Sequence, residues 1–224
     1  MPQRQTATNV VSAVLRIVFA LIGLFVVIAL IVAGGFRECA TFTLQSNLMM
    51  AVSFGWTAVT LLGRWRTPPE WLAGSAVFYI AITGLVYRLV LRPDDFPLAG
   101  SFLGWFANLN NIEHILTPIG AFVIWFVFAE HRRVAWKYVW GWLIYLVAYV
   151  AVILTLVAVI PGAEAPYPFL STAINGVGGV AWRVVVFFVG FTGLAAALIL
   201  LDHVLPARTR LSEFDPRDPA NQRT

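Results

Sequence analysis

Residues 10–34 read VVSAVLRIVFALIGLFVVIALIVAG, an almost unbroken run of apolar side chains. About 20 such residues in a helix cross the hydrocarbon core of a bilayer, so this stretch is long enough to span a membrane. Arg16 is the one charged residue within it. The run exceeds the hydrophobic region of a cleavable signal peptide and no small-residue cleavage pattern follows, so we expect a retained transmembrane helix.

Five further stretches have the same character, and the composition agrees. Hydrophobic residues make up 60% of the 224 residues and charged residues 12%, and a soluble domain of this size could not bury so much apolar surface. The sequence therefore predicts an all-α, polytopic membrane protein, a bundle of six transmembrane helices within residues 1–204. The expected spans are 10–34, 43–62, 71–91, 102–128, 136–160 and 177–201.

The charges of the loops predict the orientation of these spans. Lys and Arg gather at the amino end, in the second and fourth loops and in the tail. Because loops rich in Lys and Arg stay in the cytoplasm, we expect both termini there and the first, third and fifth loops outside. Residues 205–224, rich in charge and Pro, are expected to form a disordered cytoplasmic tail. The expected location is the cell membrane, as a multi-pass protein of a bacterial inner or plasma membrane.

Several functional classes are excluded by residue content. Cys39 is the only cysteine, and no Cys and His cluster has the spacing of a metal site. No glycine-rich phosphate loop is present, so we expect neither a metal nor a cofactor. The net charge of +4 comes from basic residues spread over membrane edges, so the expected partner is the bilayer and not nucleic acid. The oligomeric state is left open.

One polar set lies at the start of the second span. Thr43, Ser46 and Asn47 occupy positions i, i+3 and i+4, so they share one helix face. Polar side chains are costly inside a membrane and usually have a function. Thr43 could serve only as the helix N-cap, accepting a backbone N–H, but that role leaves Asn47 unexplained.

A second polar set lies near the start of the fourth span, toward the same predicted side of the membrane. Asn110 and Asn111 precede His114 by four and three residues, so they flank its helix face. A neutral imidazole there could accept a proton, or it could simply hydrogen-bond two helices together. Pro118 removes one N–H and so frees a backbone carbonyl, which Thr117 could cover.

Two neighbouring features complete the sequence description of this region. Glu113 adjoins His114 but points about 100° away on a regular α-helix, so its expected partner is Arg88 or Arg183 and not the imidazole. In the fifth loop, Tyr167 stands between two prolines, which hold it extended. Such a rigid aromatic segment could cover an outward-facing cavity or form a plain interfacial turn.

These motifs resemble a known family. Phe42-Thr43 at the start of the second span, the Asn-rich approach to His114 and Tyr167-Pro-Phe-Leu170 before the last span are similar to the androgen-induced-gene family of six-span membrane proteins. The chain looks like a bacterial relative. The resemblance covers the number and order of the spans but depends on short motifs.

The resemblance implies a threonine hydrolase that cleaves fatty acid esters of hydroxy fatty acids, with a membrane lipid or acyl ester as substrate. Thr43 would be the nucleophile and His114 the general base. The sequence departs from the family pattern after the threonine, where Leu-Gln-Ser-Asn follows, and Pro118 comes one residue sooner. Ser46 is therefore a rival nucleophile.

Two functions of different classes remain at this point. In the hydrolase, Ser46, Asn47, Asn110 or Asn111 would bind substrate or donate to the oxyanion, and Tyr167 would line the site. The alternative is a non-catalytic protein, either a lipid- or ligand-binding scaffold or a small transporter, whose polar pocket is the binding site. No residue that orients His114 is evident, and neither inverted repeats nor broken helices favour transport.

Overall fold

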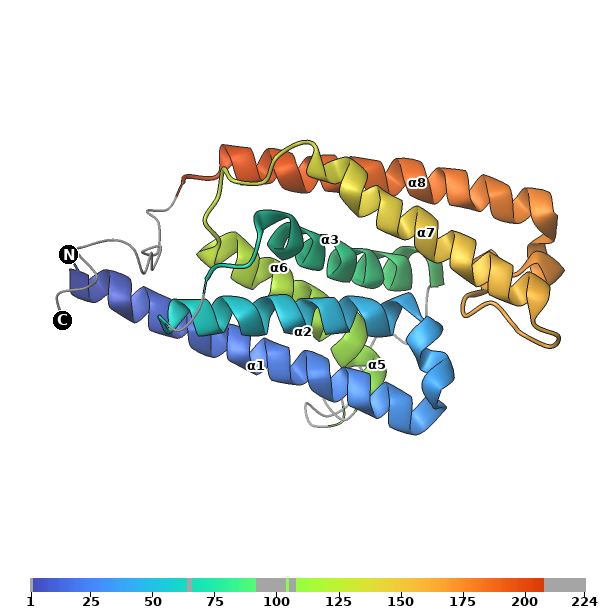
Figure 1. Cartoon of the computed structure of the whole chain (residues 1–224), viewed down its shortest axis with the longest axis horizontal. Coiled ribbons are helices and arrows are strands. Elements are labelled where there is room, and N and C mark those ends of the chain that lie inside the picture. The colour runs from blue at the N-terminus through green and yellow to red at the C-terminus, as the bar shows by residue number, and fades with distance from the viewer. Residues whose placement is uncertain (1, 64–65, 92–103, 105–107, 208–224) are drawn as a thin grey trace. The chain divides into compact units, whose positions relative to one another are not determined.

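The computed structural model describes residues 2–63, 66–91, 104 and 108–207. Within this part of the chain the regular secondary structure is entirely helical, which confirms the all-α prediction. The chain divides into two compact units: the helices up to Phe128 belong to the first, and Arg133–Leu205 forms the second. Figure 1 shows the element order from blue to red.

Five helical segments in the described residues are long and apolar enough to cross a membrane. They are Ala7–Gly34, Glu70–Leu91, Leu109–Phe128, Tyr138–Val159 and Thr172–Val204. The helix Phe42–Leu61, which corresponds to the expected second span, is 20 residues long but does not reach the same hydropathy. The site residues singled out from the sequence are among the polar side chains that lower its hydropathy, and the sixth span stays a prediction.

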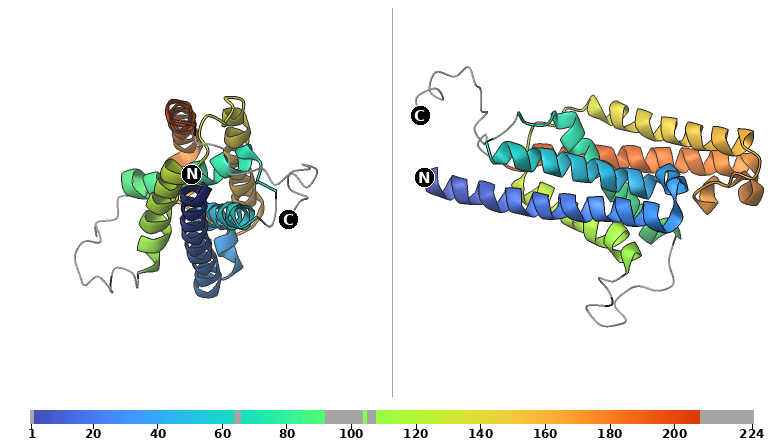
Figure 2. Two further views of the ribbon diagram at one scale, coloured as in Figure 1. Left: turned by 90° about the vertical axis from the view of Figure 1, so that its left-hand side faces the viewer. Right: turned by 60° about the horizontal axis from the view of Figure 1, so that its bottom comes forward.

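The first unit is a ring of four antiparallel helical segments. The helices α1 (Pro2–Gly34), α2 (Phe42–Leu61) and α3 (Glu70–Val86) follow one another, and α6 (Thr117–Phe128) contacts both α3 and α1. Figures 1 and 2 show α1 and α2 side by side. Small and apolar side chains of the two helices are buried, among them Val26, Met50 and Ala58. This arrangement brings the starts of α2 and α6 to the same end of the ring as the end of α3.

Two π-helical turns lie at this end of the ring. One, Tyr87–Leu91, continues α3, and the other, Ile112–Leu116, separates the short helix α5 (Leu109–Asn111) from α6. The backbone N–H of Thr117 bonds to the Ile112 carbonyl, five residues earlier. Such turns hold one extra residue within a helix and occur frequently at functional sites.

The second unit consists of α7 (Tyr138–Val159), a 3-10 turn (Pro168–Leu170) and α8 (Thr172–Val204). The two helices run antiparallel. Asp202, only 1% exposed, accepts hydrogen bonds from the backbone N–H groups of Arg133 and Val134, both at 3.0 Å. These bonds fix the end of α8 to the segment before α7, and they give a buried carboxylate its hydrogen bonds.

The helix boundaries differ from the expected spans in two places. The last helix begins at Thr172, five residues before the expected position 177, and Gly176 interrupts it with a φ of 66°. Glycine adopts that backbone conformation readily because it has no Cβ. Most of residues 102–107 at the start of the expected fourth span, and 208–224 of the expected tail, lie outside the described residues.

Candidate active site

Thr43 is not the N-cap of its helix. The cap is Thr41, whose hydroxyl accepts from the Leu44 N–H at 3.3 Å and donates to the Glu38 carbonyl at 2.7 Å. Its extended backbone (φ −79°, ψ 138°) suits that position, and the helix begins at the next residue. The capping role considered for Thr43 is therefore wrong, and its hydroxyl contacts a different partner.

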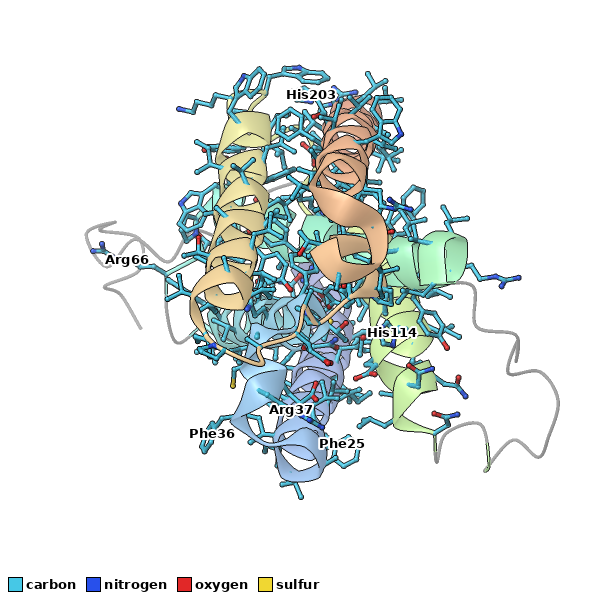
Figure 3. The ribbon with its side chains drawn as sticks, turned by 90° about the vertical axis from the view of Figure 1, so that its right-hand side faces the viewer. Phe25, Phe36, Arg37, Arg66, His114 and His203 are labelled. Carbon is cyan, nitrogen blue, oxygen red and sulfur yellow. The ribbon has the colours of Figure 1, made fainter. Side chains whose placement is uncertain are left out.

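That partner is His114. The Thr43 Oγ1 lies 3.3 Å from Nε2 of the imidazole, across 71 residues of sequence. Thr43 is 8% exposed and the His114 side chain 11% exposed, so the pair is largely shielded. Figure 3 labels His114. A hydroxyl and an imidazole at this distance are close enough for direct proton transfer. The bond is slightly long, as catalytic hydrogen bonds often are before substrate is bound.

The second ring nitrogen shows which tautomer is present. His114 Nδ1 lies 3.1 Å from the Asn110 backbone carbonyl, an oxygen that can only accept. A hydrogen bond there requires the proton on Nδ1. In the neutral ring Nε2 then carries a lone pair and faces the Thr43 hydroxyl as an acceptor. This tautomer has the lone pair on the side of the Thr43 hydroxyl, the arrangement that a general base needs.

Glu113 is the third member of this cluster. Its Oε1 lies 3.3 Å from His114 Nδ1, and its side chain is 9% exposed. The expectation that Glu113 points away from the imidazole is wrong, because its carboxylate contacts this ring and not Arg88. The expectation assumed the 100° step of an α-helix, whereas the two residues lie in a wider π turn and glutamate has a flexible side chain. Arg183 belongs to the second unit, where it donates to the Gly179 carbonyl.

The other carboxylate oxygen of Glu113 has no partner. Glu113 Oε2 and Asn9 Oδ1 are the two buried side-chain polar atoms without a hydrogen bond among the described residues. A buried polar atom without a partner is costly, and such atoms often mark functional positions. Among the described side chains, the Glu113 carboxylate therefore contacts only the His114 imidazole.

Tyr87 holds the imidazole from one face. Its ring stacks on that of His114 with centroids 4.3 Å apart and planes 19° apart. The tyrosine is 6% exposed, and its hydroxyl accepts a hydrogen bond from the Asn110 side chain. Tyr87 begins the π turn that continues α3, so each of the two π turns supplies a residue to the site.

Asn47 connects the helix of Thr43 to the π turn of His114. Its Nδ2 lies 2.9 Å from the Thr43 carbonyl and 3.4 Å from the Glu113 carbonyl, and its Oδ1 accepts from Thr117 Oγ1 at 2.8 Å. Asn47 and Thr117 are both fully buried. The Thr117 hydroxyl also lies 3.1 Å from the Glu113 carbonyl, so this carbonyl, near Pro118, is the one it covers. The amide thus fixes the backbone on both sides of the candidate dyad.

Ser46 has a different environment from Thr43. It is fully buried, and its hydroxyl bonds to the Thr43 carbonyl at 3.0 Å and to Thr83 Oγ1 at 2.7 Å. The first bond lies within α2 and the second joins α2 to α3, and no imidazole contact is described for Ser46. The geometry therefore favours Thr43 over Ser46 as the hydroxyl that a base could activate.

The remaining predicted site residues are placed as follows. Asn110 reaches Tyr87 with its side chain and His114 with its carbonyl, and Asn111 is 3% exposed. Tyr167 is extended (φ −131°, ψ 138°), as expected between two prolines, and stacks on Phe169 with centroids 5.1 Å apart. It belongs to the second unit, and its role as a cover stays a prediction, as does the choice of oxyanion donor.

The sequence interpretation missed Tyr87 and dismissed Glu113. A carboxylate within an apolar span was a visible signal, since an ionisable group there is rarely without function. Tyr87 carried no such signal, because tyrosines are common at membrane interfaces.

Comparison of the chain with protein-family models, with curated proteins and with solved structures finds no match.

Proposed function

We propose that this protein is an integral membrane hydrolase of carboxylic esters in which Thr43 is the nucleophile and His114 the general base. One observation carries the proposal: Thr43 Oγ1 lies 3.3 Å from the nitrogen of His114 that bears the lone pair. The six-span topology with both termini in the cytoplasm is part of the proposal, and it puts the site toward the outer side of a cell membrane. The resemblance of the motifs to the androgen-induced-gene family supports the same function.

The proposed reaction uses Thr43 Oγ1 and His114 Nε2 as follows. His114 Nε2 takes the proton of the Thr43 hydroxyl while Oγ1 forms a bond to the ester carbonyl carbon. As the tetrahedral intermediate collapses, the ester C–O bond breaks and Nε2–H protonates the leaving alcohol. Water then attacks the acyl-threonine, again losing a proton to Nε2, and the acid leaves as Oγ1 regains its proton. Threonine suits this task, since its β-branched side chain is stiff at χ1 and little entropy is lost in aiming the oxygen.

Glu113 supports the positive charge that appears on His114 at each proton transfer. Its Oε1 is on the Nδ1 side of the ring, opposite the reacting nitrogen. An acid in that position orients the imidazole and stabilises the imidazolium, as in hydrolase triads of unrelated folds. In this proposal Glu113 is a positioning residue and does not touch the substrate.

The substrate proposed is a lipid with an acyl ester. The surfaces of the first unit are apolar: Leu48, Val52 and Ile119 are among its exposed side chains. An acyl chain in the hydrocarbon core would meet such surfaces, while the ester group would lie at the polar end of the ring. The substrate is thereby delivered along the membrane and not through an aqueous channel.

The rival function is a non-catalytic scaffold in which the same side chains hold helices together. The hydrogen bonds between Ser46 and Thr83 and between Asn47 and Thr117 have that character. In a scaffold, the contact between Thr43 and His114 would be one more such bond, worth about 1 kcal/mol. Its loss would affect folding stability and no covalent chemistry.

A fluorophosphonate probe separates the two functions. It phosphonylates an activated hydroxyl with loss of fluoride, so we expect labelling of the detergent-purified protein that maps to Thr43. Thr43→Ala and His114→Ala should abolish labelling while the folded yield stays at the wild-type level. No labelling of folded wild-type protein, or labelling that survives His114→Ala, would contradict the proposal.

Thr57→Ala is a matched control. Thr57 lies on the same helix, and its hydroxyl bonds to the Ser53 carbonyl of that helix at 2.8 Å. This substitution removes the same hydroxyl from the same helix without touching the imidazole, so labelling should remain. Ser46→Ala should also be labelled. Loss of labelling in this variant, together with a probe adduct mapped to Ser46 in the wild-type protein, would make Ser46 the nucleophile.

A further inference from the structure

A buried arginine lies on the first helix at a distance from the candidate active site. Arg16 is 6% exposed and lies in the first third of the apolar stretch 10–34. Its guanidinium lies over the Phe54 ring, with Cζ 5.1 Å from the centroid. Phe54 is 11 residues after Thr43 on the same helix, so the two positions are separated by about 16 Å along its axis. Arg16 therefore lies well away from Thr43 along the α1 and α2 pair.

The charge of Arg16 is not neutralised by the described part of the chain. Its Nε donates to Ser12 Oγ at 3.3 Å, and no described carboxylate is paired with its guanidinium. A buried charge without a counter-charge is costly, and in a membrane it is retained where it has a function. Four of the five N–H donors of the guanidinium are left for a partner.

The guanidinium is not wholly enclosed by the protein. The buried side-chain atoms that lack a hydrogen bond are Asn9 Oδ1 and Glu113 Oε2, and no nitrogen of Arg16 is among them. Because the side chain bonds to the residue four positions earlier, it points toward the amino end of α1. Asn9, Ser12 and Arg16 are spaced i, i+3 and i+7 and so share one helix face.

We propose that Arg16, Ser12 and Asn9 bind the head group of an anionic phospholipid. The guanidinium presents a planar fork that matches phosphate oxygens, and it would take the phosphodiester. The unpartnered Oδ1 of Asn9 would accept a hydrogen bond from a head-group hydroxyl, as a phosphatidylglycerol offers. The acyl chains would lie on the exposed apolar residues of the same helix, which include Val10, Val14 and Ile17.

The proposal rests on the membrane location proposed above and is independent of ester hydrolysis. The site would lie toward the membrane face opposite to Thr43. A lipid bound there would tie α1 to α2 through Arg16 and Phe54, so binding should raise the stability of the helix pair. Thr43→Ala, which removes the proposed nucleophile, should leave lipid binding unchanged.

The test measures lipid binding to the full-length chain in a neutral maltoside detergent. Phosphatidylglycerol, phosphatidylcholine and inorganic phosphate are titrated separately, with thermal unfolding and native mass spectrometry as readouts. We expect phosphatidylglycerol to raise the unfolding midpoint by several degrees and to stay bound, whereas phosphatidylcholine does neither. An equal response to inorganic phosphate alone would overturn the lipid as the occupant.

Substitutions locate the binding site. Arg16→Met keeps an apolar stem and removes the charge, and it should weaken phosphatidylglycerol binding about tenfold or more. Arg37→Met is the matched control, because that arginine is exposed in the connection between α1 and α2, where Figure 3 labels it. A wild-type response in Arg16→Met would overturn the proposal.

Two further measurements keep the test decisive. If Arg16→Met does not fold, a phosphatidylglycerol with a photoreactive head group is cross-linked to the wild-type chain, and adducts within residues 9–16 or at Phe54 are expected. Adducts confined to other segments would overturn the site.

The acidic residues of the tail are another candidate partner for the charge of Arg16. They are Glu213, Asp215 and Asp218, which lie outside the described residues. A chain ending at Ala207 should bind phosphatidylglycerol as the full chain does. Lipid binding found only after truncation would mean that the tail neutralises Arg16 in the full chain, and it would overturn the proposal.

Discussion

Replacing Glu113 by Gln tests whether the carboxylate next to His114 assists the proposed reaction. Glutamine has nearly the volume of glutamate, and its Oε1 can still accept from Nδ1–H. The packing of the π turn and the tautomer of the ring should therefore persist, since the Asn110 carbonyl also holds the Nδ1 proton at 3.1 Å. The substitution removes the negative charge and little else.

The expected magnitude follows from the distance between the two groups. When His114 takes the Thr43 proton it becomes a cation, 3.3 Å from Glu113 Oε1. Two opposite unit charges at that separation attract by about 5 kcal/mol at an effective dielectric constant of about 20. The amide dipole of glutamine recovers part of this. With about 1.4 kcal/mol for each factor of ten in rate, we expect a loss of about 1,000-fold.

The assay is the second-order rate constant for fluorophosphonate labelling of purified protein. Glu113→Gln is compared with wild type and with Glu130→Gln, which removes a carboxylate from the loop after α6. Size-exclusion profiles establish that the three proteins are equally folded. Labelling of Glu113→Gln at the wild-type rate would refute the reasoning, because the imidazolium would then gain nothing from the carboxylate.

Two other substitutions test how the site is supported. In Gly84→Ala the new Cβ would lie 2.9 Å from Pro118 Cβ and 3.2 Å from the His114 carbonyl oxygen, so α3 must shift; we expect a loss of about 1–3 kcal/mol in the free energy of unfolding, measured by titration with dodecyl sulfate. Gly141→Ala, where a Cβ meets open space, is its control, and equal stability of the two variants would contradict the close contact. Asn47→Leu removes three hydrogen-bond contacts; at about 0.6 kcal/mol each in a membrane, unfolding should become easier by about 2 kcal/mol in the same titration. An unchanged transition would show that the amide does not connect α2 to the π turn.

The sequence was a good guide where one segment determines its own structure. An apolar run of sufficient length forms a helix in a membrane because every backbone N–H and C=O is then satisfied within the segment. The ends of α7 consequently lie within two residues of the expected limits. The extended backbone of Tyr167 followed from its two proline neighbours for the same local reason.

Local patterns were a poor guide at the start of α2. Thr41 and Thr43 both have the residue type of an N-cap, and nothing in the sequence distinguishes them. The structure assigns the cap to Thr41, because the chain enters the helix from the extended backbone at that residue. That assignment leaves the hydroxyl of Thr43 for the imidazole.

What the sequence determined by itself is the set of apolar helices and the two polar groups placed near their ends. The tertiary structure decided which of those polar atoms meet: Thr43 with His114, Asn47 with Thr117, and Glu113 with the far side of the imidazole. The reason is geometric. The direction of a side chain on a helix depends on the turn beneath it, and the π turn at Ile112–Leu116 changes that direction without leaving a mark in the apolar pattern.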